Sequence, residues 1–476
     1  KATACHLQEK QRKKNTVTMQ TAGPRGRRLG GTEHSWCRAV PGGTGIVALG
    51  ILCTFKLTEG FLSHLESSLR RIQSCNPIIK SKLRWDTSAK TFTFVQSSAL
   101  KIKVSTLLST LKLLEDLRYR SPNVSSLHLL VEHELNLNSW VDDHPKGNEV
   151  AFATIYELQD SQNVIVLRFH VSTCDRTTGV ALLNQLLDLI AEEKTNDVGE
   201  NQADKEDDLS FSIEELIPAG MTKKSIWARG VDVLSYSMNS FRLNNLPFKD
   251  TKSPRSSQVV RLQLDGNHTQ KIISECESRG IKLCGALAAA GLLAASKSCF
   301  ETRPKKYGII TLTDCRSTLK PQLASDHFGF YHSAILNTHA VKRGEKLWDV
   351  AKRCYQAFAN SKENKKHYTD MADLNFLMVK AIDNPGLTSS SSLRTSLLSI
   401  FEDTVIDNLD DVRRRVCVED YMGCASVHGI GPSIGIFDTI RDGCLDCVCV
   451  YPSPLHSREQ MVELIGDMKR ILELAV

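Results

Sequence analysis

The stretch VIVLRFHVSTCDRTTGVALLNQLLDLI, residues 164–190, decides the fold of this chain. Its first eight residues alternate as a strand does, with one wholly apolar face formed by Ile165, Leu167, Phe169 and Val171. The opposite face carries Arg168 and His170 together with two valines. Because successive side chains of a strand point to opposite faces, His170 is predicted to turn away from the more apolar face.

A helix follows the strand after a short polar turn. Its apolar residues recur at helical spacing as Leu182, Leu183, Leu186, Leu187 and Ile190. This period predicts an amphipathic helix that faces a core, and Thr177 or Thr178 can cap its first turn. His170 and Asp175 then lie at a strand-to-helix turn, where a rigid scaffold often carries functional polar groups.

A second informative region lies in the other half of the chain. YGIITLTDCRSTLKP, residues 307–321, predicts a strand that ends in a polar turn carrying Arg316. SDHFGFYHSAILN, residues 325–337, follows it and places His327 and His332 on either side of an aromatic, glycine-containing turn.

Together these motifs resemble the CoA-dependent acyltransferase superfamily, which includes chloramphenicol acetyltransferase, the plant alcohol acyltransferases and peptide-synthetase condensation domains. HVSTCDR with its Leu-rich helix resembles the HxxxD signature, and DCRSTL resembles the Arg-bearing strand. HFGFY resembles the DFGWG region, with His327 in the place of the aspartate and matching Phe328 and Gly329. CNPIIKSKL, residues 75–83, stands where the superfamily has HPxLR, so the resemblance spans about residues 40–476.

The resemblance implies an α/β (α+β) fold of two similar chloramphenicol-acetyltransferase-like domains, with mixed sheets flanked by helices and a channel at the interface. We predict a disordered basic segment over residues 1–43 and an N-terminal domain over residues 44–191. An acidic linker is predicted over residues 192–212, and a C-terminal domain over residues 213–476.

The implied activity is transfer of an acyl group from a CoA thioester to an alcohol or amine. Acyl-CoA would be a co-substrate, with no permanently bound cofactor and no metal. By resemblance, His170 is the general base, a task that suits an imidazole titrating near neutral pH. Asp175 would pair with Arg316 and shape the turn. Further channel residues are expected at Ser172, Thr173, His327, Phe328, Gly329, Tyr331, His332 and Ser433.

The motif departs from the superfamily pattern at two positions. The histidine is expected four residues before the aspartate, but Val171 stands there, and Arg176 replaces the usual glycine. A shift of one residue along a strand turns a side chain to the other face. The chain could therefore be a catalytically impaired binding or scaffolding protein, or His327 or His332 could supply the base. A carrier-protein-dependent condensation enzyme would keep the same chemistry.

The composition of the chain indicates which classes of protein to set aside. The chain is 41% hydrophobic and 24% charged, with a net charge of +6. Nine lysines and arginines against two acidic residues fall within residues 1–38, so the rest is nearly neutral and nucleic acid is not indicated. No run of about 20 apolar residues predicts a membrane span. Met19 could be the true start. We expect a cytoplasmic monomer.

Cysteine usage points the same way. The 15 cysteines follow no secreted framework, which favours a reducing compartment. CLDCVC, residues 444–449, contains a CxxC spacing that can supply zinc ligands, but it lacks a second ligand pair. We therefore interpret it as a strand with buried thiols.

The remaining elements follow from local patterns. Strands are predicted at residues 44–57, 125–136 and 150–160, and a hairpin joins residues 78–86 and 90–97. Helices are predicted at residues 57–75, 101–121, 283–296 and 345–383, the third of them apolar all round and therefore buried. A hairpin turning at Arg441 to Gly443 precedes a last helix.

Overall fold

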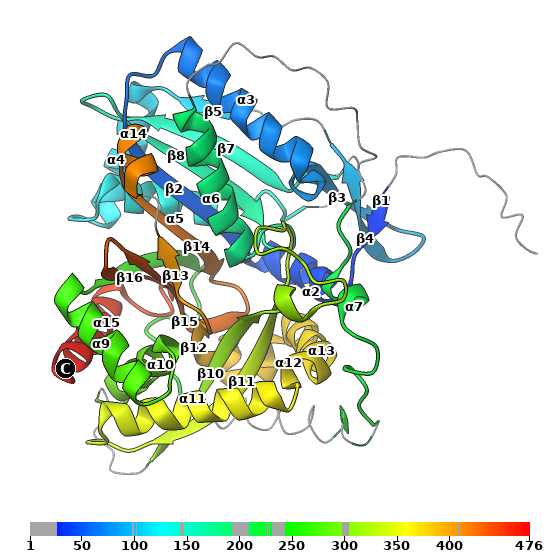
Figure 1. The fold of residues 1–476 in the computed structure, drawn as a ribbon, viewed down its shortest axis with the longest axis vertical. Coiled ribbons are helices and arrows are strands. Elements are labelled where there is room, and N and C mark those ends of the chain that lie inside the picture. Colours follow the sequence, from blue (N-terminus) through cyan, green and yellow to red (C-terminus); the bar gives the residue numbers. More distant parts are fainter. Residues whose placement is uncertain are drawn as a thin grey trace, which may run out of the picture.

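The structure is a computed structural model that describes residues 26–97, 100, 102–142, 147–192, 209–225, 227, 229–230, 243–297, 304–407 and 410–476. Two halves, each built on a mixed sheet, lie one above the other in Figure 1. The first half is coloured blue to green, and most of the second half is coloured yellow to red.

The first sheet has the strand order β14-β2-β8-β7-β5. Its strands are β2 (Thr44–Thr54), β5 (Ile102–Ser105), β7 (Ala151–Glu157), β8 (Gln162–His170) and β14 (Val418–Val427). One face packs on α3 (Glu59–Cys75) and α6 (Arg176–Ala191), in a core that contains Ile165, Leu167 and Phe169. The other face packs on α4 (Leu107–Arg120) and α5 (Ser126–Asn136) through Val164 and Val166. The predicted alternation of β8 is confirmed.

The second sheet has the order β11-β10-β12-β15-β16-β9, with β13 paired to β15. Its strands are β9 (Ser256–Gln263), β10 (Lys305–Asp314), β11 (His332–Val341), β12 (Arg394–Phe401), β13 (Val405–Asp407), β15 (Gly431–Arg441) and β16 (Cys444–Ser453). The helices on its outer face are α9 (Gly266–Ser278), α10 (Leu283–Lys297), α11 (Leu347–Glu363) and α15 (Arg458–Glu473). The predicted hairpin of β15 and β16 is confirmed.

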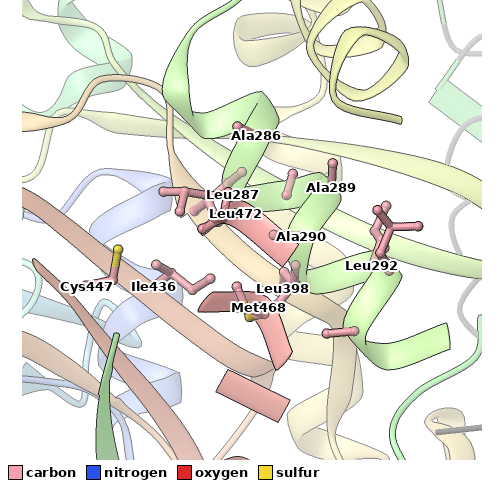
Figure 2. Close-up of a cluster of buried hydrophobic side chains, with 14 of the residues drawn as sticks. Ala286, Leu287, Ala289, Ala290, Leu292, Leu398, Ile436, Cys447, Met468 and Leu472 are labelled. Carbon is pink, nitrogen blue, oxygen red and sulfur yellow. The ribbon is translucent and has the colours of Figure 1, made fainter. Parts of the chain in front are cut away.

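Helix α10 lies at the centre of this second core. It is buried along its whole length up to Ser296, as its uniformly small apolar sequence predicts. Figure 2 shows its alanines and leucines against Leu398 of β12, Ile436 of β15 and Met468 of α15. Its alanines let the helix lie close to the sheet, because a small side chain keeps the two backbones near each other. Cys447 of β16 also packs here, and burial raises its pKa well above the ordinary value.

Shortening one side chain in this core should cost a predictable amount of stability. Ile436 is 1% exposed, and Ile436→Val should lower the free energy of unfolding by about 0.5–1.5 kcal/mol through lost burial and a small cavity. Urea denaturation measures the change. Val462→Ala on α15 is the control, because Val462 is 54% exposed and should change stability by less than about 0.5 kcal/mol. Equal effects for the two variants would contradict the packing described.

A small third sheet and a short helix include residues that were predicted to be disordered. The sheet has the order β1-β4-β3-β6, formed by β1 (Gly26–Arg28), β3 (Ser81–Asp86), β4 (Thr91–Gln96) and β6 (Asn148–Glu149). Helix α2 (Gly31–Ala39) follows β1. The prediction of disorder is therefore wrong for residues 26–43, because distant partners order them: β1 pairs with β4, and Thr32 Oγ1 donates to Glu214 at 2.6 Å. Arg27 and Glu33 add a local ion pair at 2.6 Å. Residues 1–25 lie outside the described residues.

Two further predictions need correction. Residues 126–136 form helix α5 rather than a strand, because Ser125 caps the helix by accepting from the His128 N–H, and Leu127, Leu130 and Leu135 form a buried face.

The predicted domain boundary is crossed by one strand, because β14 from the second half pairs with β2 of the first sheet. Figure 1 shows this strand beside β2. Of the predicted linker, residues 193–208 lie outside the described residues.

The structure describes four further helices. They are α7 (Ile213–Leu216), α12 (Lys366–Thr369), α13 (Met371–Asp383) and α14 (Asp410–Arg415). Short 3-10 turns lie at Val40–Gly42, Pro77–Lys80, Arg316–Thr318, Pro385–Leu387 and Ser389–Ser391. Among the described helices, none is by itself long and apolar enough to cross a membrane; α9 and α10 pass that test only as a pair, and the pair is bent by 107°. The described cysteines are free thiols.

Candidate active site

The turn between β8 and α6 is fixed by the side chain of Asp175. Asp175 is the N-cap of α6, and its Oδ1 accepts from the Thr178 N–H at 2.9 Å. The prediction that Thr177 or Thr178 caps the helix is therefore wrong. Both threonines instead reach the second half: Thr177 Oγ1 donates to Asp314 at 2.7 Å, and Thr178 Oγ1 donates to the Gly329 carbonyl at 2.9 Å.

Asp175 and Arg316 form the predicted pair. Arg316 Nη2 lies 2.9 Å from Asp175 Oδ1, and Nη1 lies 3.0 Å from Oδ2, a two-point contact with both side chains 2% exposed. Arg316 also holds Asp314 at 3.1 Å. Burial alone would raise the pKa of Asp175, but Arg316 and His332 outweigh it and lower that pKa below its usual range. The carboxylate therefore stays ionised, and the two halves meet at this pair.

His332 is a third partner of the same carboxylate. Its Nδ1 lies 2.9 Å from Asp175 Oδ2, which also accepts the Tyr331 N–H at 2.8 Å. His332 begins β11 and is 5% exposed. Its ring lies edge-on to Phe401, with centroids 5.6 Å apart, and 6.5 Å from the Phe330 ring.

A cavity of about 430 Å³ lies between the two halves. Its walls come from β2, β14 and the start of α6 on one side, and from β10, β11, β12 and β15 on the other. Helices α2 and α13 complete it. The volume falls within the range of small-molecule sites. His332, Val171, Phe330, Phe401, Ser333, Ser399, Arg176 and Asp175 are among the residues that line it.

The two faces of the second sheet have different roles, one packing against helices and the other lining the cavity. On β10, Ile309 packs in the α10 core while its neighbours Ile310 and Leu312 line the cavity. On β11, the residues that share a face with His332, namely Ala334 and Leu336, line the cavity as well. The outer face of this sheet thus stabilises the fold, and the inner face shapes a binding space.

Comparison with solved structures identifies this architecture. The trichothecene 15-O-acetyltransferase TRI3 from Fusarium sporotrichioides is similar with a TM-score of 0.71 and 13% identity, over 95% of each chain. The EpoB cyclization-docking bidomain from Sorangium cellulosum has a TM-score of 0.64 at 13% identity, over 99% of this chain and 92% of that one. The chain has the fold of the CoA-dependent acyltransferase and condensation-domain superfamily. The X-domain from teicoplanin biosynthesis is also similar, with a TM-score of 0.61, 14% identity and 96% of each chain covered.

Comparison of the sequence with known families and curated proteins finds no match. At identities this low the structural likeness establishes the fold alone. Any conclusion about activity therefore rests on the side chains of the cavity.

In this acyltransferase-fold protein, His170 does not line the cavity. It is 1% exposed and lies on the α5 face of β8, with its ring edge-on to Trp140 at a centroid distance of 5.3 Å. Its Nδ1 lies 2.7 Å from Ser172 Oγ and accepts the Ser172 N–H at 3.2 Å. Burial lowers its pKa to about 3. The structure therefore does not bring the predicted base to the binding space.

Val171 occupies the wall position instead. Its N–H donates to the Gly45 carbonyl at 3.0 Å, and both residues line the cavity. Gly45 has φ +96°, and a Cβ there would lie 2.7 Å from Val171 Cγ1. The glycine therefore allows β2 and the end of β8 to approach closely. With the one-residue shift noted in the motif, the apolar Val171 side chain lies in the cavity wall and His170 does not.

Of the other predicted channel residues, only His332 is among those that line the cavity. Ser172, Thr173 and Ser433 are fully buried, and Phe328 packs in the core of the first half. The remaining three support the Asp175 network. His327 accepts from Arg316 Nε at 3.0 Å through its carbonyl, and Gly329 bonds Thr178 through both backbone groups. Tyr331 lies under the Arg316 guanidinium, whose carbon is 5.0 Å from the ring centroid.

Arg176 stands where the motif usually has glycine, and its side chain contacts residues of the second half. It lies 3.1 Å from Asp438 of β15, donates to the Asp403 carbonyl at 2.9 Å and covers the Phe401 ring at 4.3 Å. It also lines the cavity. The replacement therefore narrows the space beside α6 and adds a cation there.

Much of the cavity wall comes from residues outside the motifs, most of all from α13 and α2. Trp36 of α2 packs edge-on to Phe330 with centroids 5.5 Å apart, and both line the cavity. Helix α13 contributes Met371, Leu374, Leu377, Met378 and Ala381. The sequence carries one signal for α13, which is apolar over most of its circumference. In the structure Leu374, Leu377 and Met378 are only half-buried, because they face the cavity.

Proposed function

We propose that this protein transfers an acyl group from a CoA thioester to an alcohol or amine bound between its halves. The observation that carries the proposal is the cavity of about 430 Å³, which is walled by the two motif-bearing elements and includes a histidine paired with a carboxylate. The likeness of fold to an acetyltransferase over nearly the whole chain supports the same class.

The wall chemistry favours apolar reacting groups. Aliphatic and aromatic side chains such as Leu312, Phe330 and Phe401 dominate the lining near His332. Such a wall excludes water, which disfavours thioester hydrolysis and favours attack by a bound alcohol or amine. We propose acyl groups and acceptors that are themselves largely apolar. One copy of the chain supplies every wall described here, so a monomer would suffice.

A second candidate function is favoured by one observation. Val171 lines the cavity wall at the motif position where a histidine was expected, and His170 lies outside the cavity. A protein that binds an acyl-CoA or another apolar ligand without turning it over would have this arrangement. The two functions differ in product formation but share the binding space.

The experiment is a mass-spectrometric screen of acyl-CoAs against panels of alcohols and amines. We expect product above the buffer rate for at least one pair, and we expect Ala334→Phe to reduce it at least tenfold, because position 334 lies on the cavity face of β11. A loss of about 1.4 kcal/mol in binding corresponds to that factor. Val462→Phe on exposed α15 is the matched control and should leave the rate unchanged.

Calorimetry of acyl-CoA binding separates the two functions. Binding that Ala334→Phe weakens, without product from any pair, would favour the binding module. Product formation that is insensitive to Ala334→Phe would place the reaction elsewhere on the protein and contradict the proposal.

A further inference from the structure

The hydrogen bonds of His170 and His332 favour opposite tautomers of the neutral imidazole ring. At His170, the Ser172 backbone N–H donates to Nδ1 at 3.2 Å, so Nδ1 carries the lone pair and the proton of the neutral ring lies on Nε2. At His332, Nδ1 faces the ionised Asp175 carboxylate at 2.9 Å. A carboxylate only accepts, so Nδ1 carries the proton there, and the lone pair of the neutral ring lies on Nε2.

This difference decides which ring can take a proton from a ligand. The lone pair of His170 is already engaged by the backbone of its own turn, and the ring does not line the cavity. The lone pair of His332 Nε2 has no hydrogen-bond partner among the described residues, and His332 lines the cavity between Phe330 and Phe401. An imidazole oriented by a carboxylate on one nitrogen, with the other facing a substrate, is a general-base arrangement.

The rest of the network keeps this arrangement in place. Arg316 binds both oxygens of Asp175, and the Tyr331 and Thr178 N–H groups donate to the same carboxylate. Asp175 therefore cannot readily take the proton from Nδ1, and the ring is fixed in one tautomer. The register of β10 with β11 pairs Asp314 with His332, and the 3-10 turn that carries Arg316 begins two residues after Asp314, so the end of β10 positions both side chains.

We propose that His332, oriented by Asp175, is the general base of this protein in place of a histidine at position 171. This inference rests on the proposed acyl transfer. His332 Nε2 takes the proton of the acceptor O–H or N–H as the acceptor atom bonds to the thioester carbonyl carbon. The tetrahedral intermediate then collapses, the C–S bond breaks, and Nε2–H returns the proton to the leaving CoA thiolate. Asp175 and Arg316 are positioning residues.

The first test uses diethyl pyrocarbonate, which acylates an accessible neutral imidazole nitrogen, with peptide mass spectrometry to locate the label. We expect His332 to be labelled in the folded protein and Ala334→Phe to suppress that label. His268, with a side chain 32% exposed, serves as an internal standard. His170 should stay unlabelled until the protein is denatured. His332 unlabelled when His268 is fully modified, or His170 labelled first, would overturn the proposal.

The second test compares two substitutions on the same strand. His332→Gln should lower kcat/KM about 100- to 10,000-fold, the usual contribution of a general base. His339→Gln is the matched control, because His339 also lies on β11, is buried, and is not among the residues that line the large cavity. Circular dichroism and thermal melting check that both variants fold. Added imidazole should restore part of the activity of His332→Ala, which a purely structural role would not allow.

These experiments distinguish the role of His332 from the proposed acyl transfer itself. Turnover that survives His332→Gln would overturn the role of His332 and leave the proposed function intact. If the wild-type protein binds acyl-CoA and forms no product, the proposed function fails and the base role fails with it, even when His332 is labelled.

Discussion

Replacing Arg316 by methionine is expected to lower the free energy of unfolding by about 3–5 kcal/mol, the usual cost of breaking a buried ion pair by removing one partner. Asp175 and Arg316 are each only 2% exposed. Without the guanidinium, the Asp175 carboxylate loses both of its contacts at 2.9 and 3.0 Å and remains buried as an uncompensated charge. Methionine keeps most of the side-chain volume, so the loss reports charge more than packing. Urea denaturation at pH 7 measures it.

Two further variants make this expectation specific. The double variant Asp175→Asn with Arg316→Met should recover part of the loss, because it removes the stranded charge. Arg70→Met is the surface control: Arg70 pairs with Glu66 at 3.3 Å, but the two side chains are 62% and 38% exposed, so its loss should cost less than about 1 kcal/mol. An Arg316→Met cost as small as that of Arg70→Met would show that the pair does not join the halves.

The residues that could be placed from sequence are those with strong local patterns. The alternation of β8 and the helical period of α6 predicted both elements, because these patterns need no knowledge of distant partners. The ion pair of Asp175 and Arg316 was predicted by resemblance and is present. Helix α5 was mistaken for a strand, because its apolar residues are too closely spaced for period two and period 3.6 to be told apart by eye.

The cavity itself could not be placed from sequence, because its walls meet only in three dimensions. Val427 of β14 and Trp36 of α2 lie far apart in the chain, and both line it. The surroundings of His170 could not be predicted either. A strand pattern gives the face of His170, but whether its lone pair is free depends on one backbone hydrogen bond from Ser172. That bond depends on the conformation of the turn after β8, which the sequence pattern does not specify.

The protein is expected to lose stability steeply as pH falls from about 6.5 to 4, because several histidines are buried in neutral form. His170, His339, His367 and His456 are each no more than 6% exposed. Burial lowers the pKa of His170 and His456 to about 3, and that of His339 and His367 to about 4. In the unfolded chain each should titrate near 6.5.

The sign follows from proton binding. Between pH 6.5 and 4 the unfolded chain binds protons at these histidines and the folded protein does not, so stability falls as pH falls. Near pH 5, where the unfolded histidines are almost fully protonated and the folded ones are not, each site costs up to about 1.4 kcal/mol per pH unit. The four together cost up to about 5 kcal/mol per unit there, against a total stability of about 5–15 kcal/mol. Asp175 acts in a different window, because its lowered pKa withdraws stability only below about pH 4.

A single substitution tests this explanation, because it changes the slope with pH rather than the stability at one pH. His456→Gln removes one titrating site that is 0% exposed. The slope of unfolding free energy against pH, from urea denaturation between pH 6.5 and 5, should decrease by about 1 kcal/mol per unit. A slope left unchanged by His456→Gln would mean that this histidine is already protonated in the folded protein, which its burial without a carboxylate contact among the described residues argues against.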